Sequence, residues 1–481
     1  MTAMNFHSPK PGNAARPGAS TRPSPGQTRM NRPRRPIFVT LLALCVLAFC
    51  LRLGAVIWLH SWLKPDAMEH RSIAQSIYDG RGFAFADFGF YGSSSFQSPP
   101  YPILLAGLFE VFGRDTWQAF LAAMVINSLA GAGTVALTYM LARALRGGEA
   151  VGLLAAAAVA IWPAQIYACT VAQAVVLITL SVTAVMGLFY ISVRTGKLAP
   201  WIAFSLIGTL AALTEPAFLP AIALTGLIVL FCKQLPVQTR IRNAAILLAA
   251  ALVVLGPWTL RNRRVHGAWV PVKSSFWVNT WKGNNDYASG TDRISLTPEQ
   301  QEKLNSRLLS ATDEQVREKG ADGAHAYDIL SSDQRKLLYG KSELQREAIF
   351  KEITTTWIRT HPARYAQLCW QRLRKTIWID WDNPKSYSLI YIVSRAVLLF
   401  TAAIGLLLAL WRRWSLGFPA LVYCSTLLLY TLTITAARFA IPFEPVMLCL
   451  SALTVVTAWE KLTRRRSFRS GPLSPVLGGE G

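Results

Sequence analysis

The sequence predicts an all-α polytopic membrane protein. Of its 481 residues, 52% are hydrophobic and only 16% are charged, and the mean hydropathy is positive. A soluble chain of this composition would leave much apolar surface outside a single core. The apolar residues also gather into runs that are long enough to cross a membrane. The expected fold is a bundle of transmembrane helices with smaller helices at its surface.

The net charge of +23 does not indicate a nucleic-acid-binding protein. The basic residues form short clusters between apolar runs, and they make no extended basic face interleaved with aromatic residues. The chain has 7 cysteines, and only Cys369 lies in a polar region. Neither a disulfide framework nor a metal site is expected from their spacing.

Residues 1–36 contain basic residues and no acid, amid many Pro, Gly and Ser residues, which predicts a disordered cytoplasmic tail. The next run, 37–59, is too long for a signal-peptide core and is expected to be an uncleaved anchor. A second basic tail, 461–481, ends the sequence.

A helix needs roughly 20 apolar residues to cross the hydrocarbon layer. About 10 segments meet or approach this length. They are 37–59, 116–142, 150–167, 174–192, 201–213, 217–232, 243–259, 388–411, 415–433 and 439–459. The segments 201–213 and 217–232 are short, and they form either two crossings or a re-entrant pair.

The run 103–112 is too short to cross, and Glu110 interrupts it, so we expect a helix at the membrane interface. Without a crossing there, the basic clusters between later runs fall on the side of the N-terminus, as the positive-inside rule requires. Both termini are then cytoplasmic, and the segments 60–115 and 261–387 face outward. We expect an inner (plasma) membrane protein with transmembrane modules at 37–260 and 388–460.

The outer segment 261–387 is expected to form a small subdomain. It contains an amphipathic helical pattern at 343–359, and its stretch 291–342 is polar and interrupted by glycines.

Several basic residues at the outer ends of predicted crossings depart from the positive-inside rule. The stretch PWTLRNRRVHG contains Arg261, Arg263, Arg264 and His266, and Arg438 lies in TAARFAIPFEP. Arginines at helix ends often extend toward lipid headgroups. Three within four residues also indicate an anionic ligand at the outer leaflet, because guanidinium groups match phosphate geometry.

Acidic residues follow the first crossing directly. In KPDAMEHRSIAQ, Asp66 lies just beyond the anchor, and Glu69 and His70 lie one turn later. Asp66 either acts as a functional carboxylate or caps an interfacial helix. A second interfacial helix begins at SPPYP, and the two helices would frame a groove at the membrane boundary.

The order of these motifs resembles the glycosyltransferase family 39-like membrane proteins of the GT-C class, which include protein mannosyltransferases and the lipid A aminoarabinose transferase. The resemblance covers about residues 37–460 without 291–342 and rests on PDAMEHRSIAQSIYDGRGF, SPPYPILLAGLFEVFG, LAALTEPAFLPAIAL, GPWTLRNRRVHGAWVPV, WKGNNDYASG and ARFAIPFEP. It implies inverting transfer of a sugar from a polyprenyl-phosphate donor at the outer face. The catalytic acid of the family falls on Asp66.

We therefore expect Asp66 to be the general base and Arg261, Arg264 and Arg438 to contact the donor phosphate. Further substrate contacts are expected from Glu69 and His70. Asn262 and Asn284 would contact sugar or phosphate, unless they only build turns. Glu215 is either a second outer acid or a helix cap.

The sequence departs from the family pattern at Ala67, His70, Ser98 and Gln173. Ala67 and Gln173 stand where many relatives have acids, so neither a bound metal nor another cofactor is expected. The partners expected are the lipid-linked sugar, membrane lipids and a glycan, lipid or protein acceptor, without nucleic acid. A flippase for lipid-linked sugars, or an inactive relative acting as a scaffold, is the alternative.

Overall fold

The computed structural model describes residues 34–291, 299, 302 and 329–469. Helices dominate this part of the chain, and six are long and apolar enough to cross a membrane. This confirms an all-α, multi-pass membrane protein. The predictions for the tail 1–36 and for most of 291–342 lie outside the described residues.

The six long helices or helical segments are α1 (Arg34–Trp58), α4 (Trp117–Ala144), α7 (Val175–Thr195), α10 (Val237–Val254), α18 (Leu389–Trp411) and the segment Ala437–Thr463 that includes most of α20 (Glu444–Arg469). The helices α5 (Glu149–Ile161) and α6 (Pro163–Tyr167) make a seventh if their pair, bent by 51°, is one crossing. Three shorter apolar helices complete the predicted set: α8 (Leu198–Thr214), α9 (Leu219–Phe231) and α19 (Gly417–Leu432). Each of the ten expected crossings is thus mostly helical, and the number that cross remains a prediction.

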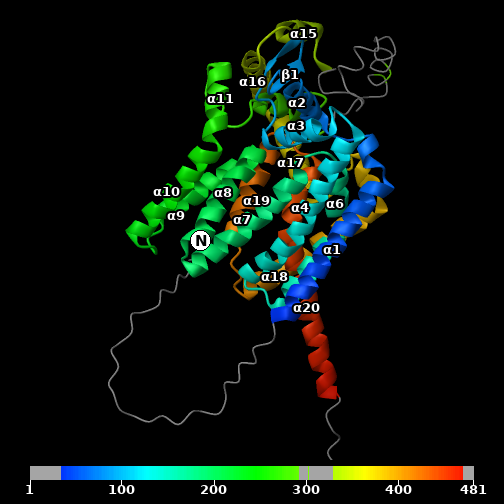
Figure 1. Cartoon of the computed structure of the whole chain (residues 1–481), viewed down its shortest axis with the longest axis vertical. Helices are drawn as coiled ribbons and strands as arrows, with labels where there is room; N and C mark the ends of the chain where they lie inside the picture. Colours follow the sequence, from blue (N-terminus) through cyan, green and yellow to red (C-terminus); the bar gives the residue numbers. More distant parts are fainter. Residues whose placement is uncertain (1–33, 292–298, 300–301, 303–328, 470–481) are drawn as a thin grey trace, which may run out of the picture.

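The long helices lie side by side, and the smaller elements gather at one end of the bundle (Figure 1). That end carries α2 (Met68–Tyr78), α3 (Pro100–Phe112), α11 (Gly256–His266), α12 (Phe276–Gly283), α15 (Ser332–Leu338), α16 (Glu343–Thr360) and α17 (Pro362–Ile377). The first residues of α1 and the last residues of α20 lie at the opposite end. The two segments predicted to face outward therefore share one end of the molecule.

The burial of the long helices separates a centre from a periphery. Within their most apolar stretches, 72% of the α7 residues are buried, against 11% for α1 and for α10. The exposed apolar side chains of α1 and α10 include Phe38, Leu42, Leu248 and Leu252. An apolar surface of this kind suits a lipid environment.

A broken helix provides a partner for a buried arginine in α1. Pro163 starts α6 after the bend, so the last carbonyl groups of α5 lack amide donors in their own helix. Arg52 is fully buried, and its guanidinium donates to the carbonyl oxygens of Val159 and Ala160, at 3.0 Å each. The first membrane helix is thereby fixed to the bend.

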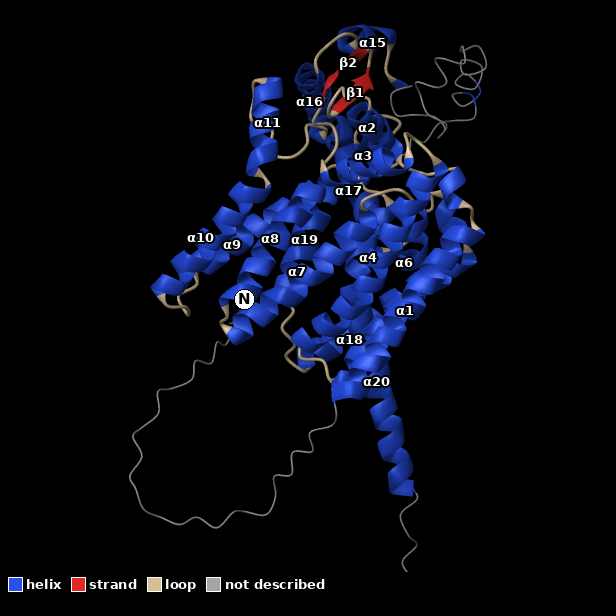
Figure 2. Ribbon diagram, viewed as in Figure 1, coloured by secondary structure: helices blue, strands red, loops and turns tan. Residues whose placement is uncertain are grey.

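The chain between α2 and α3 forms a β-hairpin (Figure 2). Strands β1 (Ala84–Asp87) and β2 (Phe90–Ser93) pair antiparallel, with Asp87 opposite Phe90. The two residues between them, Phe88 and Gly89, have φ values of 48° and 72°. Positive φ at both positions is what a tight hairpin turn requires.

A cluster of buried apolar side chains joins this hairpin to α12, α15 and α16. Its buried members are Phe96, Val278, Trp281, Leu330, Leu338 and Phe350. The helix predicted at 343–359 is confirmed as α16, which begins with a capping box between Ser342 and Gln345. The outer segments thus form one packed unit on the helical bundle.

Close packing of α18 on α20 yields a test of the fold. A Cβ atom at Gly405 would lie 2.0 Å from the carbonyl oxygen of Leu450, so Gly405→Ala must separate the two helices. We expect a loss of about 1–3 kcal/mol in stability, measured by thermal unfolding of the purified protein in detergent. Gly54→Ala on α1 is the control, because no atom lies within 4 Å of its added Cβ. Equal melting temperatures for the two variants would contradict this packing.

Candidate functional site

Asp66 lies in the short connection between the turn η1 (Ser61–Leu63) and α2. The N-cap residue of α2 is Ala67, so Asp66 lies one position before the cap. One Asp66 carboxylate oxygen accepts a hydrogen bond of 3.0 Å from the side-chain amide of Gln173, and the Asp66 carbonyl accepts a second of 3.1 Å. Met68 has a φ of 49°, which is costly for a residue other than glycine.

A chain of buried polar groups fixes the surroundings of Asp66. The amide of Asn127, which is fully buried, donates to the carbonyl oxygen of Val171 at 3.0 Å and to the Tyr101 hydroxyl at 3.3 Å. The Tyr101 ring packs on His70, with 5.3 Å between ring centroids. Gln173 thus contacts Asp66, and Tyr101 contacts His70 in the first turn of the helix that follows.

Glu69 and His70 form the next layer, and both are half-buried. Gln97 donates to the Glu69 carboxylate at 3.2 Å. Burial opposes ionisation of Glu69, but the positive charges of Lys282 and Arg438 help to outweigh burial and bring its pKa below the ordinary value. Burial also lowers the pKa of His70 to about 4, so His70 is neutral at pH 7.

Three cationic side chains act on this pair of residues. The charges of Lys282 on α12 and Arg438 on η6 (Ala437–Phe443) act on Glu69, and those of Lys273 and Arg438 act on His70. Lys273 also lies 3.9 Å from Glu215. Glu215 caps the turn η3 (Pro216–Phe218) by accepting from the Ala217 amide, which is one of the two roles expected for it.

A close backbone contact between Gly283 and Thr433 joins the two segments that carry Lys282 and Arg438. A Cβ atom at Gly283 would lie 2.2 Å from the carbonyl oxygen of Thr433, so only glycine permits this approach. Asn284 donates to the same carbonyl at 3.0 Å, and Arg372 donates to the Gly283 carbonyl at 2.7 Å. Asn284 is fully buried, so its amide fastens the junction and is not placed to meet a substrate.

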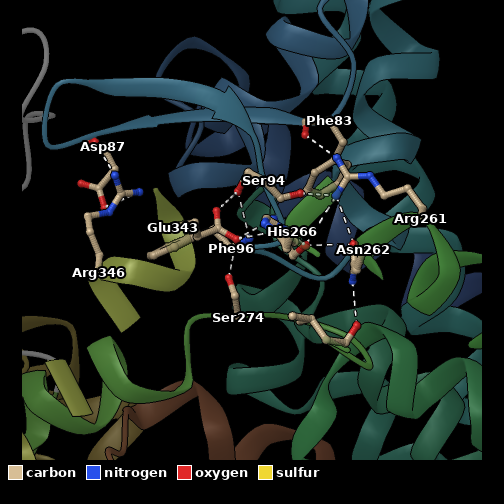
Figure 3. Close-up of polar contacts among 12 residues, drawn as sticks. Phe83, Asp87, Ser94, Phe96, Arg261, Asn262, His266, Ser274, Glu343 and Arg346 are labelled. Atoms are coloured by element: carbon tan, nitrogen blue, oxygen red, sulfur yellow. Dashed lines mark hydrogen bonds and ion pairs between the residues drawn. The ribbon is translucent and has the colours of Figure 1, made fainter. Parts of the chain in front are cut away.

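A second cluster, shown in Figure 3, holds the outer segments together. Arg261 donates to the carbonyl oxygens of Phe83, at 2.8 Å, and Ser94. Asn262 is fully buried and donates to the carbonyl oxygen of Val270 at 2.9 Å. The structure therefore gives both residues a supporting role, which differs from the predicted direct contact with phosphate or sugar.

Glu343 is the acidic member of that cluster. Its carboxylate accepts from the Ser95 amide at 2.8 Å and from the hydroxyls of Ser94 and Ser274 at 2.5 Å each. His266 also lies here, and its Nε2 atom is 2.7 Å from the Ser95 hydroxyl and 3.6 Å from the Glu343 carboxylate. A hydrolytic triad needs the acid at the other ring nitrogen, Nδ1, and an accessible hydroxyl. Ser95 is fully buried, so this cluster is a structural junction.

The structure thus brings the charge of Arg438 to Glu69 and His70, which follow Asp66 in the chain, and places Glu215 beside Lys273. Arg264 is exposed in the last turn of α11 and is not among the charges that act on Glu69 or His70. Sequence reasoning missed Lys273 and Lys282. Both lie in the outer segment 261–387, so the positive-inside argument applied to Arg261 would also have found them.

No family model matches the sequence, and no curated protein matches it. Among solved structures, the chain is similar to the apo oligosaccharyltransferase of Archaeoglobus fulgidus, with 14% identity and a TM-score of 0.49 over 92% of this chain and 53% of that chain. The same enzyme, AglB, solved with an inhibitory peptide and a dolichol-phosphate, gives a TM-score of 0.48 at 14% identity over 93% of this chain and 52% of that one. ArnT of Cupriavidus metallidurans, bound to undecaprenyl phosphate, gives a TM-score of 0.38 at 12% identity over 93% and 83% of the two chains. The chain spans about half the length of the oligosaccharyltransferase.

The oligosaccharyltransferase has also been solved with zinc and sulfate, at a TM-score of 0.49 and 14% identity over 89% of this chain and 50% of that one.

The residues around Asp66 offer few ligands for a metal ion. Cations such as Mg²⁺ and Ca²⁺ require several oxygen ligands. Across the described residues, no three His, Cys, Asp or Glu side chains lie together in a suitable group. Gln173 also directs an N–H group at Asp66, and an N–H group cannot bind a cation. The residues present do not fit a metal.

The position of α12, and with it Lys282, depends on Glu347 of α16. The Glu347 carboxylate accepts from the amides of Trp277 and Val278, at 2.7 Å and 3.0 Å, and so satisfies the first turn of α12. Burial raises the pKa of Glu347 to about 7, although both hydrogen bonds oppose this change.

A raised pKa means that the folded protein binds this proton more tightly than the unfolded chain does. The contribution of Glu347 to stability is therefore complete below its ordinary pKa of 4.5 and is lost as the pH rises through about 7. We expect Glu347→Gln to remove this part of the pH dependence, measured as melting temperature from pH 4.5 to 8. The control is Glu352→Gln on the same helix, where the side chain is exposed. Parallel curves for wild type and Glu347→Gln would contradict the assignment.

Proposed function

We propose that this protein is a GT-C-type membrane glycosyltransferase. It transfers a sugar, with inversion, from a polyprenyl-phosphate donor to a lipid, glycan or protein acceptor at the outer face of the membrane. The observation that carries the proposal is an acid, Asp66, that Gln173 orients just before Glu69 and His70, the two residues on which the charges of Lys273, Lys282 and Arg438 act. Dolichol-phosphate and undecaprenyl phosphate, the lipids in the names of the two similar structures, belong to the proposed donor class.

In this proposal, Asp66 is the general base. As the acceptor oxygen attacks the anomeric carbon, its proton passes to the Asp66 carboxylate. The new carbon–oxygen bond forms while the bond from the anomeric carbon to the phosphate oxygen breaks. The phosphate keeps that electron pair and leaves as polyprenyl phosphate, with one more negative charge. A positioned base contributes about 10²- to 10⁴-fold to such a step.

Lys282 and Arg438 are the groups that would stabilise the leaving phosphate. Positive side chains aimed at a developing negative charge lower the barrier most when they are preorganised and partly shielded from water. The junction of Gly283, Asn284 and Arg372 supports this preorganisation, because it fixes the backbone beside both cations. Arg261 and Asn262 then act by holding the outer loop, and Arg264 lies outside the proposed site.

Glu69 and His70 are the proposed contacts to the sugar or the acceptor hydroxyl. Glu69 accepts hydrogen bonds as an anion, and neutral His70 offers one donor and one acceptor. The Nδ1 atom of His70 is buried and has no hydrogen-bond partner within the described part of the chain. A ligand hydroxyl would satisfy this atom.

The first test is Asp66→Asn, which keeps the shape of the side chain and removes the base. We expect kcat for transfer from a polyprenyl-phosphate sugar to fall about 10²- to 10⁴-fold, with little change in melting temperature. The control is Asp79→Asn, because Asp79 is exposed and pairs only with surface arginines among the contacts of the described residues. Undiminished transfer by Asp66→Asn would overturn the mechanism. Movement of the lipid between leaflets without any transfer by wild type would favour the flippase.

The second test addresses the phosphate contact. Lys282→Gln should weaken binding of undecaprenyl phosphate about 10- to 100-fold, the value of one or two hydrogen bonds to a charged group. Tryptophan fluorescence in detergent would measure the dissociation constant. Lys336→Gln is the control, because the side chain of Lys336 is 80% exposed on α15. Equal affinities for both variants would exclude Lys282 from the phosphate site.

A further inference from the structure

The side-chain amide of Gln173 has a defined orientation. It faces two groups that only accept hydrogen bonds, the carboxylate and the carbonyl oxygen of Asp66, at 3.0 Å and 3.1 Å. The nitrogen of the amide, and not its oxygen, must therefore point at Asp66. Gln173 is 7% exposed, so solvent does not compete effectively for these bonds.

The backbone that carries Gln173 is fixed as well. Residues 171–174 connect the turn η2 (Ala168–Thr170) to α7, and Ala172 in this connection is fully buried. Asn127 binds the Val171 carbonyl from α4, the helix beside α7. A short connection held at both ends keeps the Gln173 amide in place.

We propose that Gln173 is the positioning residue for Asp66 and that the site works without a divalent cation. This proposal rests on the proposed role of Asp66 as the base. If residue 173 were also an acid, its carboxylate and that of Asp66 would repel each other. A shared cation is one way to keep both ionised and oriented. A neutral amide orients one carboxylate through an N–H donor and adds no charge. The positive charge needed for the phosphate then comes from the protein's own side chains.

Replacing the side-chain amide of Gln173 by a carboxylate should make the site depend on a divalent cation. Gln173→Glu keeps the shape of the side chain but places a second carboxylate beside Asp66. The repulsion between the two acids is relieved when a cation binds between them. This variant should acquire a dependence on divalent cations that the wild-type protein lacks, and a merely structural role of Gln173 would not produce it.

The chain offers a matched control in Gln165. The Gln165 amide is 3% exposed and also donates to one carboxylate and one carbonyl oxygen, those of Glu444 at 2.9 Å and Ile441 at 3.0 Å. Gln165→Glu therefore makes the same chemical change beside a different acid. Arg395 lies 3.6 Å from Glu444 and already supplies a positive charge there.

The experiment measures two quantities for wild type, Gln173→Glu, Gln173→Ala and Gln165→Glu. The first is sugar transfer from a polyprenyl-phosphate donor, with EDTA and then with Mn²⁺ or Mg²⁺. The second is the melting temperature with and without Mn²⁺, which needs no turnover. We expect equal wild-type transfer in EDTA and Mn²⁺. Gln173→Glu should be inactive in EDTA and recover in Mn²⁺, and it alone should be stabilised by Mn²⁺.

Gln173→Ala should lower kcat by up to about 100-fold, because a misplacement of roughly 1 Å can cost that much. Its KM for the donor should change little, since the phosphate contacts are elsewhere. The proposal is overturned if EDTA abolishes wild-type transfer, if Gln173→Glu is indifferent to cations, or if Gln173→Ala keeps its kcat. It is also overturned if Mn²⁺ stabilises wild type or Gln165→Glu as strongly as Gln173→Glu. Failure of the proposed function gives a different result. The wild-type protein would then transfer no sugar from any donor, while Mn²⁺ would still raise the melting temperature of Gln173→Glu.

Discussion

Burying charge in a mostly apolar chain is the constraint on which this structure depends. An ionised side chain that leaves water must find partners, or the cost of several kcal/mol is not recovered. Three buried arginines in the described part of the chain meet that requirement largely by donating to backbone carbonyl oxygens near the ends of helices, and one of them, Arg395, also lies 3.6 Å from Glu444. Arg52 binds the end of α5, Arg372 binds the end of α12, and Arg395 binds the carbonyl oxygens of Thr376 and Ile377 at the end of α17.

These contacts explain why segments far apart in the sequence converge at one end of the bundle. Arg52 joins α1 to the end of α5, Arg372 joins α17 to the end of α12, and Arg395 joins α18 to the end of α17. The result is a set of junctions at the ends of α5, α12 and α17. The junction at the end of α12 bears on the candidate site, because Gly283, which Arg372 binds, directly follows Lys282.

The cations of the candidate site lie near two side chains of the first turn of α2. Lys282 and Arg438 act on Glu69 through their charges, and Lys273 and Arg438 act on His70. A charge held near an acid and a neutral histidine, in a half-buried place, is suited to an anionic ligand.

The sequence by itself determined the helical membrane fold, because the length and composition of the apolar runs leave few alternatives. It also identified Asp66, Glu69, His70 and Arg438, since charges beside membrane helices are costly and few. It could not decide which polar residues face a ligand. Arg261, Asn262 and Asn284 have the residue types of a binding site, but only the tertiary structure placed them against carbonyl oxygens. The same holds for Gln173, whose contact with Asp66 spans 107 positions of the chain. Local sequence patterns record helix periodicity and burial, while such partnerships depend on how distant segments pack.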